Sequence, residues 1–142
     1  MRALLDVNVL VALLDANHTS HRHAMNWFSR HASAGWASTP MTENGCVRIL
    51  SDPGYPNAQP LQQVVQRLRL ATAEPIHEFW PDRLSLMDEG WFDATRIHGA
   101  RQLTDTYLLA LAVHRDGRLV TLGSGLALAA VKGAEPRHLL TL

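Results

Sequence analysis

The chain alternates short apolar segments of strand length with longer segments of helical periodicity, and this alternation restricts its fold more than any other feature. The apolar segment Ala3–Leu5 ends at Asp6 and is typical of a buried strand, and an apolar stretch of helical length follows it directly. When helices connect successive strands, the strands can pair in parallel while helices cover the sheet. We therefore predict an α/β fold with a mostly parallel central sheet flanked by helices on both faces.

The individual elements follow from the same two periodicities. Thr39 followed by Pro40 predicts the N-cap and first helical residue of one helix, and Thr104 predicts the cap of another that runs to Arg115. Residues 81–101 are mixed in character and predict short helices, and residues 52–60 predict a loop. The predicted strands are Ala3–Leu5, Gly35–Ser38, Ile76–Trp80, Leu119–Leu122 and His138–Leu140, and the other predicted helices are Val7–Leu14, one that follows Thr19–Ser20, and Leu61–Leu70.

Length and charge limit the class of protein. A chain of 142 residues suggests a single domain over residues 1–142. Thirteen Lys and Arg residues balance 13 Asp and Glu residues, so any attraction to nucleic acid must be local. Cys46 is the single cysteine, which excludes an internal disulfide and a thiolate zinc cluster. No apolar run is long enough to span a membrane, and we expect a cytoplasmic protein.

Three carboxylates occupy positions where a packed fold disfavours charge. Asp6 ends an apolar strand, Glu43 is in line with the apolar stripe of its helix, and Asp105 precedes an almost wholly apolar helix. The carboxyl ends of strands and the adjacent helix starts form the ligand crevice of open α/β sheets. Acids that converge there favour a hard divalent cation, Mg²⁺ or Mn²⁺, which can activate water and neutralise charge on a phosphodiester.

Each acid also has a purely structural interpretation. Asp6 can cap the helix that follows it, and Asp105 can be a favourable charge at a helix N-terminus. Glu43 can lie half-exposed at the edge of its helix. The positions of the three acids alone leave these alternatives open.

Several segments resemble the PIN domain, and more closely the VapC toxins of bacterial toxin–antitoxin pairs. The segments that carry the resemblance are LLDVNVLVALLD around Asp6, TENGCVRIL around Glu43 and LTDTYLLALAV around Asp105, with HEFWPDRLSL and RLVTLGSGLA in matching order. Each motif is weakly specific alone, but their order covers essentially the whole chain.

The resemblance implies a PIN-like fold and a Mg²⁺- or Mn²⁺-dependent endoribonuclease. The substrate implied is a structured RNA such as tRNA or ribosomal RNA, cut to leave 5′-phosphate and 3′-hydroxyl ends. The implied partners are a VapB-type antitoxin and a second copy of the chain in a homodimer. Asp6, Glu43 and Asp105 match the acids of the family's active site, and Asn8 matches a supporting polar position.

The chain departs from the family at Gly123, where a fourth acid is usual. Thr121 and Ser124 are candidates for holding water in place of that acid, and Thr104 is a further supporting candidate beside Asp105. The departure leaves open an alternative function, a catalytically silent or attenuated module that binds antitoxin or RNA without cutting it.

Other features have weaker functional interpretations. LLDVNV also resembles the D-x-D strand end of haloacid-dehalogenase-type phosphatases, but Asn8 replaces the second Asp. His18, His21 and His23 are better explained as a solvated helix start than as a metal site. Most tryptophans are expected in the core or at a dimer contact, with base stacking as an alternative. The candidate phosphate contacts are Arg22, Arg30, Arg48, Arg67, Arg69 and Arg101.

Overall fold

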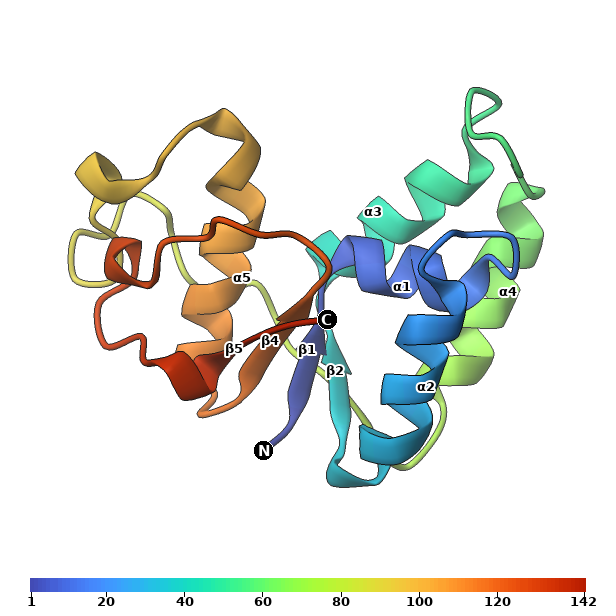
Figure 1. Cartoon of the computed structure of the whole chain (residues 1–142), viewed down its shortest axis with the longest axis horizontal. Helices are drawn as coiled ribbons and strands as arrows, with labels where there is room; N and C mark the ends of the chain where they lie inside the picture. Colours follow the sequence, from blue (N-terminus) through green and yellow to red (C-terminus); the bar gives the residue numbers. More distant parts are fainter.

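The computed structural model describes residues 1–142. Five strands form one sheet in the order β3-β2-β1-β4-β5, and every neighbouring pair is parallel (Figure 1). The predicted parallel sheet is therefore confirmed, without an antiparallel strand. The strands are β1 (Ala3–Leu5), β2 (Trp36–Ser38), β3 (His77–Phe79), β4 (Arg118–Thr121) and β5 (Leu139–Thr141).

Helices cover both faces of the sheet, as predicted. In Figure 1, α1 to α4 lie to one side of the strands and α5 lies to the other. No helix is both long and apolar enough to cross a membrane. The helices are α1 (Val7–Leu14), α2 (His21–His31), α3 (Pro40–Ser51), α4 (Leu61–Thr72) and α5 (Leu103–His114).

Alternation along the strands divides the core into two parts. Leu4 packs with the cluster around α5, whereas Ala3 and Leu5 pack with the cluster around α1, α3 and α4. In β4, Leu119 joins the first cluster and Val120 the second. Because successive side chains of a strand point to opposite faces, these short strands are buried on both sides.

The helix starts differ in how well the sequence predicted them. Thr39 caps α3 through its side chain, which accepts a hydrogen bond from Thr42 N–H, and Pro40 opens the helix, as predicted. The predicted cap at Thr104 is wrong, because a 3₁₀ turn at Ala100–Gln102 leads directly into α5, which starts at Leu103. Residues 81–101 contain 3₁₀ turns rather than short α-helices.

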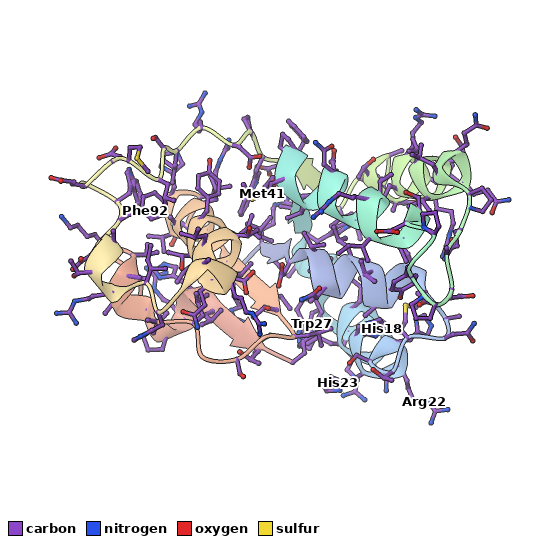
Figure 2. The ribbon with its side chains drawn as sticks, turned by 90° about the horizontal axis from the view of Figure 1, so that it is seen from above. His18, Arg22, His23, Trp27, Met41 and Phe92 are labelled. Atoms are coloured by element: carbon purple, nitrogen blue, oxygen red, sulfur yellow. The ribbon has the colours of Figure 1, made fainter.

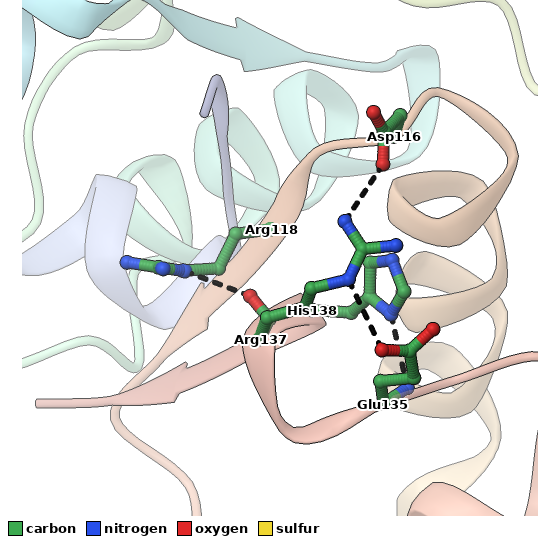
Figure 3. A network of polar contacts seen from close by, with 5 residues as sticks. All are labelled: Asp116, Arg118, Glu135, Arg137 and His138. Carbon is green, nitrogen blue, oxygen red and sulfur yellow. Dashed lines mark hydrogen bonds and ion pairs between the residues drawn. The ribbon is translucent and has the colours of Figure 1, made fainter.

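Strand β5 starts one residue later than predicted, because a 3₁₀ turn at Pro136–His138 precedes it. In Figure 3, Arg137 of this turn donates hydrogen bonds to Asp116 Oδ1 (3.0 Å) and Glu135 Oε2 (3.2 Å). Its carbonyl oxygen accepts a hydrogen bond from Arg118 Nε (2.9 Å). These contacts join the turn to the start of β4, the strand with which β5 then pairs.

The strand order reverses at β1. The chain runs outward from β1 through β2 to β3, then crosses back to β4 on the other side of β1 and continues to β5. In open parallel sheets, ligands bind at the carboxyl ends of the strands where the order reverses. That point lies between the ends of β1 and β4, next to Asp6 and Thr121.

Candidate active site

Asp6 is held in place by its neighbour across the strand reversal. It directly follows β1 and is only 2% exposed. It occupies the N-cap position of α1, but its side chain accepts no capping hydrogen bond. Instead its Oδ2 accepts a hydrogen bond from Thr121 Oγ1 (2.7 Å). Thr121 Oγ1 in turn accepts a hydrogen bond from Gly123 N–H (3.0 Å). Asp6 therefore contacts the end of β4 as well as occupying the start of α1.

Asp105 faces Asp6 from the first turn of α5. Burial, with a further contribution from the negative charge of Asp6, raises the pKa of Asp105 to about 6. Burial also raises the pKa of Asp6, although the Thr121 hydroxyl and the backbone N–H groups of Val7 and Asn8 act in the opposite direction. Two neighbouring carboxylates with raised pKa values form an electrostatically unfavourable pair.

A hard divalent cation fits this pair. Neither acid forms an ion pair with a basic side chain. Carboxylate oxygens are the ligands that Mg²⁺ and Mn²⁺ prefer, and a cation between the two groups would remove their repulsion. The chemistry of Asp6 and Asp105 thus matches the predicted metal at two of the three predicted acids.

Glu43 lies on another part of the same sheet edge. It belongs to the first turn of α3, and its Oε1 accepts a hydrogen bond from Ser38 Oγ (2.7 Å) at the end of β2. Ser38 Oγ is also 2.8 Å from His77 Nε2. Glu43 borders a cavity of about 290 Å³ between α3 and α4. No three acid, histidine or cysteine side chains are placed to hold one metal ion.

The predicted supporting residues have different positions. Thr121 is buried and contacts Asp6, whereas Asn8, Thr104 and Ser124 are exposed. A Cβ atom at position 123 would lie 3.6 Å from Asp105 Oδ2 and 3.4 Å from Thr121 Oγ1. Position 123 therefore faces the acid pair, although glycine provides no ligand there.

Ser38 and His77 contact each other beside Glu43, and neither was among the predicted site residues. A polar residue at the carboxyl end of an apolar strand was the available signal for Ser38. His77 had no comparable signal, because the pairing of β2 with β3 brings it there.

Two histidines of the segment His18–His23 contact neighbouring backbone groups. His18 Nδ1 accepts a hydrogen bond from Ser20 N–H, and His21 Nδ1 lies 2.7 Å from the carbonyl oxygen of Ala12. These contacts fix the start of α2 against α1.

The sequence is similar along its whole length to known ribonucleases. It is 48% identical to the ribonuclease VapC44 of Mycobacterium tuberculosis over 142 residues, which is the full length of both chains. It is 41% identical to the ribonuclease VapC39 of the same organism over 134 residues, which cover 94% of this chain and 96% of that one. No protein-family model matches the chain.

Two solved structures share the fold at low sequence identity. One is VapC20 of Mycobacterium tuberculosis, a toxin that cleaves the sarcin–ricin loop, with a TM-score of 0.61 and 9% identity. The other is VapBC2 of Rickettsia felis, bound to a DNA fragment from its promoter, with a TM-score of 0.55 and 16% identity. Each match covers 87% of this chain and 89% of the other.

Proposed function

The chain belongs to the VapC family of PIN-domain ribonucleases, and on this premise we propose that it is a divalent-metal-dependent endoribonuclease centred on Asp6 and Asp105. The observation that carries this proposal is the juxtaposition of these two carboxylates, both with raised pKa values, at the point of strand reversal. A site that repels its own charges is suited to a ligand that carries positive charge.

The residues of the chain have distinct roles in this proposal. Thr121 fixes the orientation of Asp6 through its hydrogen bond to Oδ2. Asp105 is the more exposed partner and is the side of the pair that substrate reaches. Bound Mg²⁺ or Mn²⁺ would supply an activated water and stabilise the charge that develops on the phosphate.

Glu43 has a proposed supporting role. Its carboxylate is held by Ser38, close to the same sheet edge but outside the acid pair. We assign to it the orientation of water or substrate at the α3 side of the crevice. The overall reaction is hydrolysis, in which water oxygen bonds to phosphorus, the bond to the 3′-oxygen breaks, and that oxygen gains a proton.

The proposed substrate is a structured RNA, with tRNA or ribosomal RNA as the first candidates. The proposed partners are a VapB-type antitoxin and a second copy of the chain. The fold shared with a toxin that cleaves the sarcin–ricin loop supports the RNA substrate, and the fold shared with a VapBC toxin–antitoxin protein supports the antitoxin partner.

Cleavage of purified tRNA and ribosomal RNA tests the proposed activity. The parent, Asp6→Asn and Asp105→Asn are incubated with RNA and either Mn²⁺, Mg²⁺ or a chelator. Discrete fragments are expected only for the parent with metal. Glu74→Gln is a matched control, because it removes an exposed carboxylate that follows α4. Fragments of equal yield from Asp6→Asn or Asp105→Asn would refute the assignment.

A second candidate function rests on Gly123. This position faces Asp105, yet it carries no carboxylate, and this observation favours an attenuated or silent module that binds antitoxin or RNA. Because the contacts of a Cβ atom at position 123 are ordinary in length, Gly123→Asp should fold normally. A large gain in cleavage by Gly123→Asp would support the attenuated parent, and unchanged cleavage would favour a site that is complete without a fourth acid.

A further inference from the structure

We propose that the cleft between α2 and the end of β5 binds the single-stranded RNA segment adjacent to the cleaved bond. This inference rests on the proposed function, because it assigns the path of that substrate. The cleft has a volume of about 370 Å³. It is lined by His23, Asn26, Trp27, Arg30, His31, Thr141 and Leu142.

The charge of α2 suits a polyanion. Its 11 residues include two arginines and three histidines, and no acid. The chain as a whole has a net charge of zero, so this helix is a local excess of basic groups. Arg30, His23 and His31 are exposed and line the cleft together. Local basic groups of this kind can contact successive phosphates of a nucleic acid strand.

The cleft also contains an aromatic surface with a fixed orientation. The rings of Trp27 and His31 are stacked, with their centroids 5.2 Å apart and their planes inclined by 16°. His31 Nδ1 lies 2.9 Å from the carbonyl oxygen of Trp27. Because a carbonyl oxygen only accepts, Nδ1 is the donor, and Nε2 is left for another partner. Stacked aromatic rings beside cations are a common platform for unpaired bases.

Strand register connects the cleft to the acid pair. Thr141 of the cleft pairs with Thr121, and Leu142 N–H donates a hydrogen bond to the carbonyl oxygen of Thr121 (2.9 Å). Thr121 is the residue that contacts Asp6. In the view from above in Figure 2, Trp27 lies nearer the middle of the molecule than His23 and Arg22, which lie toward its edge. The end of β5 that borders the cleft is thus hydrogen-bonded to the strand whose Thr121 holds Asp6.

Binding of a labelled single-stranded RNA of about 12 nucleotides, measured by fluorescence anisotropy in the presence of chelator, tests this inference without cleavage. Arg30→Gln should weaken binding about five- to tenfold and reduce the slope of log K against log salt by about 0.7. His31→Ala should weaken binding about tenfold through lost stacking. Lys132→Gln is the matched control, because it removes one exposed positive charge that belongs neither to α2 nor to the cleft. It should bind as the parent does.

The outcomes separate this inference from the proposed function. Parent-like RNA binding by both Arg30→Gln and His31→Ala would overturn the inference even if the protein cleaves RNA. An equal loss in Lys132→Gln would also overturn it, because the attraction of RNA to the protein would then be diffuse. If Arg30→Gln and His31→Ala weaken antitoxin binding but leave RNA binding unchanged, the cleft belongs to a protein partner and the inference is overturned. Cleft-dependent RNA binding without metal-dependent cleavage would support the cleft and refute the nuclease.

Discussion

Replacing Asp105 with asparagine should make the metal-free protein more stable at neutral pH, although the change removes a proposed metal-binding acid. The pKa of Asp105 is raised from 3.8 to about 6, first by burial and then by the charge of Asp6. The folded state therefore holds this proton more tightly than the unfolded state. The free energy of unfolding is lowered as pH rises from about 4 through about 6, and the whole penalty is present at pH 7.5.

The magnitude follows from the size of the shift. One pKa unit corresponds to about 1.4 kcal/mol, so the full shift corresponds to about 3 kcal/mol. Because Asp105 is partly exposed, solvent screening reduces this value, and we expect a gain of about 1–2 kcal/mol for Asp105→Asn. For a chain of this size, the gain corresponds to a rise in Tm of roughly 3–7 °C.

Urea denaturation in the presence of chelator measures this effect. Parent and Asp105→Asn are compared at several pH values between 4 and 8, on the order of one unit apart. The difference between their free energies of unfolding should be small near pH 4 and should grow as pH rises through 6. A variant that is no more stable than the parent at pH 7.5, or a difference of constant size across the range, would refute the reasoning.

Three further perturbations have expected results. Thr121→Val should lower the free energy of unfolding by about 1–3 kcal/mol in urea titrations, because buried Asp6 loses its hydroxyl donor, and Thr121→Ser should restore most of the loss. Tyr55→Phe should cost about 1.5–3 kcal/mol at pH 7 in the same assay, because the buried Asp15 carboxylate loses a hydrogen bond from the Tyr55 hydroxyl; parent-like stability would contradict this. Mn²⁺ should raise the Tm of the parent, measured by calorimetry, but not that of Asp6→Asn, and an equal rise in both would place the ion elsewhere.

Local signals in the sequence predicted the elements that depend on local chemistry. Thr39 and Pro40 are adjacent in the chain, and the capping box that they open needs only Thr42. Strand β1 and helix α1 were predicted at their observed bounds, because Asp6 separates two strongly apolar segments. Thr104 failed as a cap because the preceding turn at Ala100–Gln102 supplies the start of α5, and that turn has no clear sequence signal.

The arrangement of the candidate site depends more on tertiary contacts than the bounds of the helices and strands do. The positions of Asp6 and Asp105 at element ends favoured a meeting at the sheet edge, although the same positions left purely structural roles open. The direction of the Glu43 side chain was not predictable in this way. It is set by Ser38 and His77, which come from two different strands. The role of Glu43 in the reaction stays a prediction, which Glu43→Gln in the same cleavage assay would test.

The hydrogen bond between Thr121 and Asp6 joins residues that are 115 positions apart in the chain. Because β1 pairs with both β2 and β4, a chain growing on the ribosome can pair β1 with β2 early but can add β4 only after residues 118–121 have been made. Until residue 121 has left the ribosome, Asp6 has neither its hydroxyl donor nor β4 beside it. The surroundings of Asp6 are therefore complete only when segments from both ends of the described chain have been made and have paired.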